Sequence, residues 1–189
     1  MGSRVAAGAL LALRIFCVGS TLWNARAQEF LPSPPADKTL IYILDADHKL
    51  APLPFEAGHT PLKISETAKS SKTSYLEISG EKAATTLPAS PRLFLFTSER
   101  QGTHPPFIVW LTPRRGARRA RAVTQAGMAG FAIDSAEIVM PTVRVLAKSG
   151  DEVFMELGPR TSLMPGEYAI IGNDLTRIAT FRVATASMP

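Results

Sequence analysis

Apolar and polar residues alternate with a period of two along most of the chain beyond residue 38, as is typical of β-strands. The segments that carry this pattern, or a short continuous apolar run, are 39–44, 50–56, 75–79, 92–98, 105–112, 118–125, 130–140, 142–157 and 167–183. They correspond to roughly ten short strands, and no apolar stripe of helical period joins them. The pattern predicts an all-β fold, an antiparallel β-sandwich of immunoglobulin-like type.

Two segments are expected to lie at the centre of the core. Residues 92–98 (RLFLFTS) and 105–112 (PPFIVWLT) are almost continuously apolar and too short for stable helices. Alternation places the odd-numbered residues of 107–111 on one face of the second strand and the even-numbered residues on the other. Both strands are therefore predicted to be covered on both faces.

Turn residues divide the pattern into hairpins. The segment DADHK (45–49) joins the first two predicted strands, and Pro52 and Pro54 cannot donate to a ladder, so the returning strand should lie at a sheet edge or be badly broken. Farther along, the turn KSGD provides Gly150 for a position with positive φ.

The first 27 residues have the pattern of a signal peptide. A basic start at Arg4 precedes an apolar stretch, and Ala25 and Ala27 are the small residues that a signal peptidase requires. Arg14 interrupts the apolar stretch and disfavours a stable membrane span, although an uncleaved anchor is the alternative. Three prolines in residues 29–37 predict an extended tether over 28–38. A single domain would then cover 39–189, secreted or periplasmic after cleavage.

Removal of this leader changes the charge of the protein. The chain has 21 basic and 16 acidic residues, and the leader contains three arginines and no acid, so 18 basic and 16 acidic residues remain, a net charge of +2. No global field for capturing nucleic acid is expected at this charge. The single cysteine also belongs to the leader, so disulfides cannot stabilise the mature domain.

The segment LMPGEYAI (163–170) predicts a structural corner. Pro165 presets φ for the first position of a tight turn and Gly166 tolerates the second. Tyr168 would then bury its ring and direct its hydroxyl back to a backbone group a few residues upstream, with Leu163 packed beneath the turn. The alternative is a plain hairpin whose tyrosine faces solvent.

These residues resemble those of known domains. LMPGEYAI resembles the L-x-P-G-x-Y corner of immunoglobulin-like and fibronectin-type domains. The succession IYILDADHKLAPL, YLEISGEKAATTL, PRLFLFTS and LMPGEYAI also resembles a loose group of uncharacterised secreted bacterial proteins, over most of residues 39–172. The resemblance implies the same sandwich fold and carries over no catalytic residues.

The densest charge feature is RRGARRAR (114–121). It contains five arginines in eight residues: Arg114, Arg115, Arg118, Arg119 and Arg121. Guanidinium groups bind phosphates in bidentate fashion, so one interpretation is a site for a polyanion such as lipopolysaccharide or anionic lipid. The other is a solvated hairpin tip with its turn at Pro113 and Gly116. No aromatic residues are interleaved to stack bases, so nucleic acid is not an expected partner.

Candidates for metal binding and catalysis are weak in this sequence. Asp45, Asp47 and His48 could ligate a metal, but aspartates are also what a hairpin turn needs for its own backbone bonding. No HExxH or GxSxG motif occurs, and Ser135 has no recognisable base nearby. The three histidines all lie in predicted loops: His48, His59 and His104. No metal or cofactor is expected.

The combined features predict a noncatalytic binding or structural module of unknown ligand, with a sheet edge available to pair with a strand of another envelope protein. Two alternatives remain. The first is an envelope-associated polyanion binder that uses the five arginines. The second is a hydrolase or metal-dependent enzyme built from the loop histidines and carboxylates.

Overall fold

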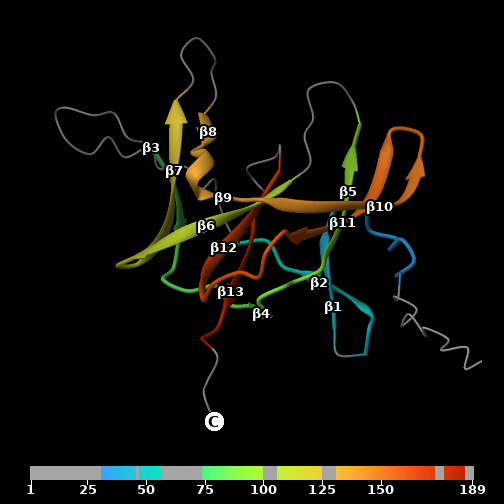
Figure 1. Ribbon diagram of the computed structural model, residues 1–189, viewed down its shortest axis with the longest axis horizontal. Coiled ribbons are helices and arrows are strands. Elements are labelled where there is room, and N and C mark those ends of the chain that lie inside the picture. The colour runs from blue at the N-terminus through green and yellow to red at the C-terminus, as the bar shows by residue number, and fades with distance from the viewer. Residues whose placement is uncertain are drawn as a thin grey trace, which may run out of the picture. The chain divides into compact units, whose positions relative to one another are not determined.

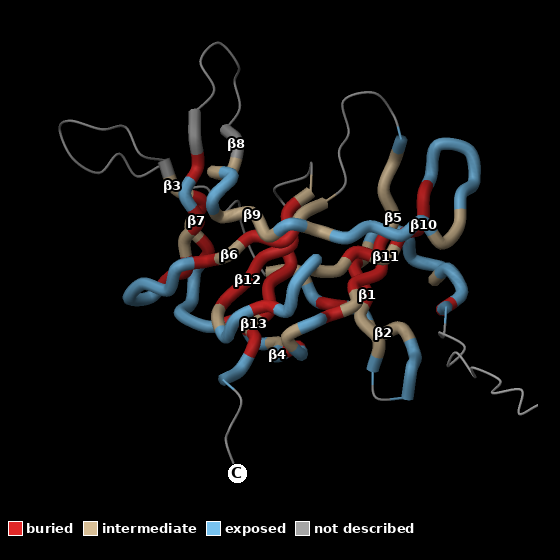
Figure 2. The backbone as a smooth tube through the Cα atoms, viewed as in Figure 1, coloured by how far each residue is buried: buried red, intermediate tan, exposed pale blue. Residues whose placement is uncertain are grey.

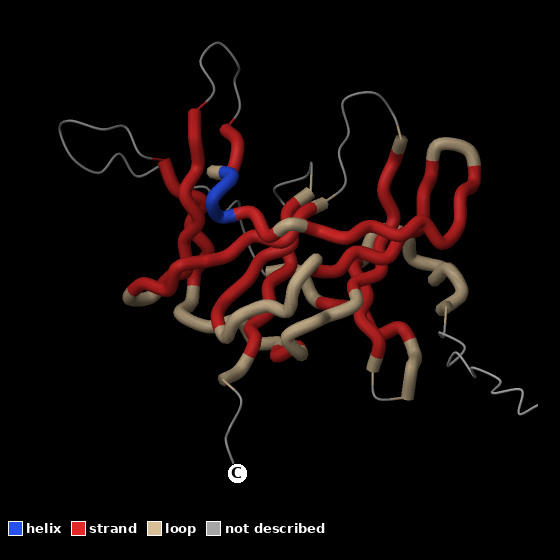
Figure 3. The backbone as a smooth tube through the Cα atoms, in the orientation of Figure 1, coloured by secondary structure: helices blue, strands red, loops and turns tan. Residues whose placement is uncertain are grey.

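The computed structural model describes residues 31–45, 47–56, 74–99, 106–124, 131–172 and 177–185. The predicted signal peptide and the first residues of the predicted tether lie outside these ranges. Leu31–Pro189 forms one compact unit, and its described part consists almost entirely of strands and loops (Figure 3). The exception is a single turn of 3-10 helix, η1 (Ser135–Glu137). The all-β prediction is confirmed for this part of the chain.

Five strands form the first sheet, in the order β10-β11-β5-β1-β2, and all neighbours are antiparallel (Figure 1). Their bounds are β1 (Ile41–Leu44), β2 (Leu50–Leu53), β5 (Leu93–Ser98), β10 (Pro141–Ser149) and β11 (Glu152–Pro159). β2 ends the sheet, so the edge position predicted from Pro52 and Pro54 is confirmed. Gly150 has a φ of 59°, as predicted for the turn between β10 and β11.

Eight strands form the second sheet. The main order is β3-β7-β6-β12-β13-β4; in addition, β8 pairs with β7 and β9 pairs with β6. Their bounds are β3 (Ser74–Ser79), β4 (Thr86–Leu87), β6 (Phe107–Arg114), β7 (Ala117–Thr124), β8 (Phe131–Ile133), β9 (Ile138–Val139), β12 (Gly166–Ile171) and β13 (Ala179–Val183). All pairs are antiparallel except β13 with β4, which run parallel.

The largest apolar cluster lies between the two sheets and is called the inter-sheet core here. The first sheet contributes residues such as Leu93 and Met155, and the second sheet contributes Ile108, Ile170 and Phe181. These side chains occupy alternate positions on their strands, and the buried segments of both sheets are shown in red in Figure 2. Because each sheet buries one face against the other, the two sheets have a sandwich-like arrangement.

Further apolar clusters cover the opposite faces of both sheets. Leu76 and Ile78 of β3 pack with Val109 and Leu111 of β6. β7 pairs with β6 only near their hairpin, and β9 pairs with β6 farther along the strand. On the other face of the first sheet, Phe94 of β5 packs in a cluster with Tyr42 and Phe154. The predicted coverage of β5 and β6 on both faces is therefore confirmed.

The described residues contain thirteen strands, more than the roughly ten expected. One source of the difference is segment 130–140, expected as a single strand, which is divided into β8 and β9 by η1. The Asp134 side chain caps that turn by accepting from the Ala136 amide at 3.0 Å. The short β4 was not expected at all, because two paired residues leave no periodic pattern.

Candidate functional site

The five arginines of segment 114–121 lie on the hairpin between β6 and β7. The strands end at Arg114 and begin again at Ala117, and Gly116 has a φ of 75° in the turn, a conformation that favours glycine. Successive side chains of a strand point to opposite faces, so Arg118 and Arg119 are directed to different sides of the sheet. The cluster seen in the sequence is therefore divided by the structure.

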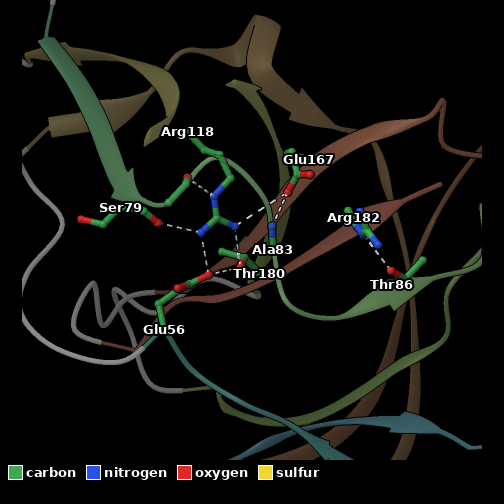
Figure 4. Close-up of polar contacts among 9 residues, drawn as sticks. Glu56, Ser79, Ala83, Thr86, Arg118, Glu167, Thr180 and Arg182 are labelled. Atoms are coloured by element: carbon green, nitrogen blue, oxygen red, sulfur yellow. Dashed lines mark hydrogen bonds and ion pairs between the residues drawn. The ribbon is translucent and has the colours of Figure 1, made fainter. Parts of the chain in front are cut away.

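Arg118 is directed inward and is only 1% exposed. Its Nε donates to the Gly80 carbonyl at 3.0 Å, its Nη1 to Thr180 Oγ1 at 2.8 Å, and its Nη2 to Glu56 Oε1 at 2.9 Å and to the Ser79 carbonyl at 3.0 Å (Figure 4). The guanidinium therefore joins β3, β13 and the end of the β2 segment around one buried centre.

Glu167 of β12 completes this buried cluster. Its Oε2 lies 3.8 Å from Arg118 Nη1 and accepts a hydrogen bond from the Ala83 amide at 2.7 Å (Figure 4). Glu167 and Thr180 are both buried. A charge removed from water is tolerated only when it is paired and hydrogen-bonded, and each nitrogen of the guanidinium has a partner here. Arg118 therefore has no exposed surface for a ligand, and its proposed place among the ligand-binding arginines is corrected.

Arg119 and Arg121 are directed to the other face of the sheet, where each has an acidic partner. Arg119 Nε lies 2.6 Å from Glu77 Oε2, and its guanidinium lies over the Tyr75 ring, 5.8 Å from the centroid. Arg121 Nη1 lies 3.5 Å from Asp134 Oδ2. Together with Arg114 and Glu137, these arginines line a hollow of about 360 Å³. The carboxylates around this hollow reduce its attraction for an anion.

The tip of the hairpin forms a second surface that contains cations. Arg114 and Arg115 line a second hollow of about 470 Å³ with Lys82, and we call these three residues the tip cations. Glu81 and Glu167 also line it, and Glu81 accepts from the Gly116 amide at 3.0 Å, which holds the 80–82 segment against the turn. Of the predicted polyanion site, Arg114 and Arg115 thus share this hollow, whereas Arg114, Arg119 and Arg121 share the other one.

Tyr168 lies near the start of β12 and is 1% exposed. Its hydroxyl donates to the Met164 carbonyl at 2.7 Å, four residues upstream. The ring meets Trp110 edge to face at 5.1 Å and stacks on Phe181 at 5.3 Å. Burial raises the pKa of the Tyr168 hydroxyl to about 12. Leu163 is buried close to the turn and belongs to the inter-sheet core.

Gly166 fills a different role from the one expected of it. It is not among the described glycines with positive φ, which are Gly80, Gly116 and Gly150. Instead, a Cβ at position 166 would lie 2.8 Å from Cη2 of Trp110 and 3.1 Å from its Cζ3. Glycine is needed there because the indole ring packs directly on the backbone.

The loop carboxylates and histidines show turn geometry where the structure describes them. Asp45 Oδ1 accepts from the amides of Asp47 at 2.9 Å and Lys49 at 2.8 Å, so this carboxylate organises the hairpin turn. His48 occupies the same turn with a φ of 59°, whereas His59 and His104 lie outside the described residues. Ser135 begins η1. Within the described ranges, no group of three or more potential ligand residues could hold a metal ion.

An exposed apolar edge was not singled out by the sequence. β10 is the longest edge strand in the described part of the chain, and Met140, Val143 and Val145 are 63%, 44% and 58% exposed. Val143 pairs with Leu157 and Val145 with Met155, and both partners belong to the inter-sheet core. Val143 and Val145 thus lie on the same face of the first sheet as the inter-sheet core, but beyond the part of that face that is covered. Figure 2 shows most of β10 as exposed.

Sequence reasoning also missed the acceptors around Arg118. The available signal was the presence of Glu167 and Thr180 inside the apolar runs GEYAII and ATFRV, because a polar residue at a core position needs a buried partner. Glu56, at the end of the proline-containing segment, gave no comparable signal.

Comparison of the chain with models of protein families, with curated proteins and with solved structures finds no match. The resemblance to secreted bacterial proteins therefore stays a prediction that depends on the motifs quoted for it. Among the residues that the structure describes, no helix has the length and apolar character to cross a membrane.

Proposed function

We propose that the protein is a noncatalytic binding module whose contact surface is the free edge of β10, and that its partner is an extended segment of another protein. The observation that supports this most is the exposure of Val143 and Val145 on a nine-residue edge strand. An edge strand offers a row of backbone donors and acceptors that a second strand can satisfy, and side-chain pockets add specificity.

The geometry of β10 favours such a partner. The strand pairs with β11 on one side only, and no described strand lies along its other side. A segment added there would extend the first sheet by one strand, and its inward side chains would lie beside Val143 and Val145. Those valines would then lose their exposed apolar surface to the partner, which is favourable by about 25 cal/mol for each Å² buried.

We further propose that the topology is immunoglobulin-like. In immunoglobulin domains, strands A, B, E and D form one sheet, and C, F and G form the other, to which variable domains add C′. The succession β1-β5-β11-β10 corresponds to A-B-E-D, and β7-β6-β12-β13 corresponds to C′-C-F-G. This correspondence assigns Trp110 to strand C and Tyr168 to strand F, the strands that carry these residue types in immunoglobulin domains. The other five strands would be additions.

The expected location is outside the cytoplasm, secreted or periplasmic. Support comes from the leader pattern of residues 1–27. Edge pairing with an envelope protein is compatible with either compartment.

Site-specific photocrosslinking tests the proposal. A benzophenone amino acid is introduced at position 143 or 145 of the full chain, which is then irradiated in envelope extract. A matched control carries the same group at Met164, which is 70% exposed and belongs to the connection between β11 and β12 rather than to β10. A discrete adduct from 143 and 145, absent from 164 and abolished by Val145→Glu or Val143→Glu at the unlabelled position, is expected. Equal labelling from all three positions, or none, would contradict the proposal.

A second candidate function is polyanion binding through the tip cations. It is favoured by the hollow of about 470 Å³ that Lys82, Arg114 and Arg115 share. The test is retention on immobilised heparin, compared between Lys82→Ser/Arg114→Ser/Arg115→Ser and the charge-matched Lys49→Ser/Lys148→Ser/Arg160→Ser. Salt screens exposed ion pairs and so releases a protein that is held by them. If the tip cations bind polyanions, only the first variant should elute at much lower salt. Equal shifts in both variants would indicate a nonspecific charge effect.

A further inference from the structure

The first sheet has a gap between β1 and β5. These two strands pair only at Tyr42 with Phe94 and Ile43 with Leu93, although β5 continues to Ser98. Beyond the last pair, residues 38–41 and 95–98 face one another across a cleft of about 420 Å³. The cleft is lined by residues of both sheets.

The walls of this cleft are mainly apolar. Ile41 and Leu95 come from the first sheet, Ile170 comes from the second, and Phe55 lies where the chain bridges to β13. Ile41, Leu95 and Ile170 belong to the inter-sheet core and are only 9%, 2% and 0% exposed, so they form the floor of the cleft, whereas Phe55 packs against the core and is partly exposed. Small-molecule sites have volumes of roughly 300–1,000 Å³ and are lined largely by apolar side chains with a few polar groups. The cleft meets this description.

Two cations complete the lining, one associated with each sheet. Lys38 precedes β1, and its Nζ lies 5.7 Å from the centroid of the Phe96 ring. Arg177 precedes β13, and its guanidinium lies 5.0 Å from the centroid of the Phe55 ring. Among the described residues that line the cleft there is no carboxylate.

Two acidic groups interact with these cations from outside the lining. Lys38, which is half-exposed, forms an ion pair with Glu152 of β11. Asp37 is bound to Thr39 and interacts electrostatically with Arg177. An exposed ion pair of this kind is weak, so its cation can accept a second anion. The polar group of a ligand that suits these two cations would therefore be an anion.

We propose that this cleft binds a single-chain amphiphile with an anionic head group, of the fatty-acid type, with the chain in the apolar cleft and the carboxylate between Lys38 and Arg177. This site is separate from the β10 edge, so neither proposal depends on the other. Thr97 and Ser98 provide hydroxyl groups along the same cleft, which can complete the hydrogen bonding of a carboxylate.

Decanoate is a suitable probe, with decanol and decyltrimethylammonium as uncharged and cationic controls. The full chain, labelled with ¹³C at Ile and Leu methyl groups, is titrated by NMR, and affinity is measured by calorimetry. Saturable one-to-one binding of decanoate with shifts of the Ile41, Leu95 and Ile170 methyl groups is expected. Absence of saturable binding, or shifts confined to other methyl groups, would overturn the proposal.

Two variants and a matched control separate the roles of charge and space. Lys38→Gln/Arg177→Gln should weaken decanoate binding by about tenfold, because it removes both cations that would contact the carboxylate, whereas Lys82→Gln/Arg115→Gln should not. Gly172→Leu should block the cleft while remaining folded, because a Cβ there would lie an ordinary 3.6 Å from Pro106 Cγ. Equal binding of decanol and decanoate, unaffected by either cleft variant, would also overturn the proposal.

Discussion

Arg118 Nη2 donates to Glu56 Oε1 at 2.9 Å and thereby connects two residues that lie 62 positions apart in the sequence. The arginine comes from the middle of the most cationic segment of the chain and is nevertheless buried. Its other hydrogen bonds go to β13 and to the end of β3. One guanidinium therefore fixes β7 against three other parts of the chain.

We expect Arg118→Met to reduce the free energy of unfolding by about 3–5 kcal/mol, because it leaves Glu167 buried without its cation. Urea unfolding followed by circular dichroism measures this loss. Arg115→Ser serves as the control and should change stability by less than about 0.5 kcal/mol, since it removes only an exposed side chain. Similar effects of the two substitutions would show that the Arg118 cluster does not stabilise the fold.

We expect Gly166→Ala to destabilise the protein by about 1–3 kcal/mol, because the added methyl group would overlap the Trp110 ring. The near-ultraviolet circular dichroism of Trp110 should change at the same time. Gly172→Ala is the matched control, since its Cβ would meet Pro106 at ordinary contact distance. If both variants unfold at the same urea concentration, the close packing of Trp110 on Gly166 is not rigid.

We expect Tyr168→Phe to reduce the free energy of unfolding by about 0.5–1.5 kcal/mol at neutral pH. The substitution keeps the ring contacts with Trp110 and Phe181 but removes the hydrogen bond to the Met164 carbonyl. Chemical unfolding at pH 7 measures this difference. A variant as stable as the wild type would mean that solvent replaces the hydroxyl without cost.

The same tyrosine predicts a loss of stability at high pH. Its pKa is raised from 10.0 to about 12 in the folded protein, mainly by burial. The contribution of the Tyr168 hydroxyl to the free energy of unfolding is complete below pH 10. It declines by about 1.4 kcal/mol per pH unit as the pH rises toward 12, because this hydroxyl loses its proton first in the unfolded chain. Burial also raises the pKa of Tyr42, which acts in the same direction. The pH dependence should therefore be reduced but not abolished in Tyr168→Phe.

Hydrogen exchange tests the edge position of β10. Every residue of β11 from Glu152 to Leu157 pairs with strands on both sides, whereas β10 pairs with β11 alone. We expect alternate amides of β10 to exchange rapidly with solvent and those of β11 to be protected, as NMR can measure residue by residue. Uniform protection along β10 would mean that another segment already covers this edge.

Local patterns predicted the strands more successfully than their partners. The alternation in FIVWL correctly assigned residues 107–111 to two buried faces, and Pro52 and Pro54 correctly indicated an edge, since both signals depend only on the strand itself. The face of each arginine in RRARA was not assigned, because alanine and arginine alternate there without a clear apolar stripe. The acceptors of Arg118 were beyond prediction, since they come from distant segments.

The same distinction applies to the candidate sites. The exposure of Val143 and Val145 depends on how far the second sheet extends, and the cleft between β1 and β5 depends on where their pairing stops. Neither the extent of the second sheet nor the end of the β1–β5 pairing is determined by the residues that line these two candidate sites. By contrast, LMPGEYAI carries the tyrosine, its turn and its acceptor within eight consecutive residues, so the geometry of that corner could be considered from the sequence alone.

The irregularity in β10 between Val145 and Ala147 has a consequence for selectivity. A bulge of this kind bends the strand and increases its twist, so the register of a neighbouring chain shifts at this point. The longer regular stretch of β10 is Pro141–Val145. A bound peptide would thus pair with β10 over about five residues. Two residues of the peptide would place their side chains beside Val143 and Val145. Such an edge would select a short linear motif rather than a whole domain face.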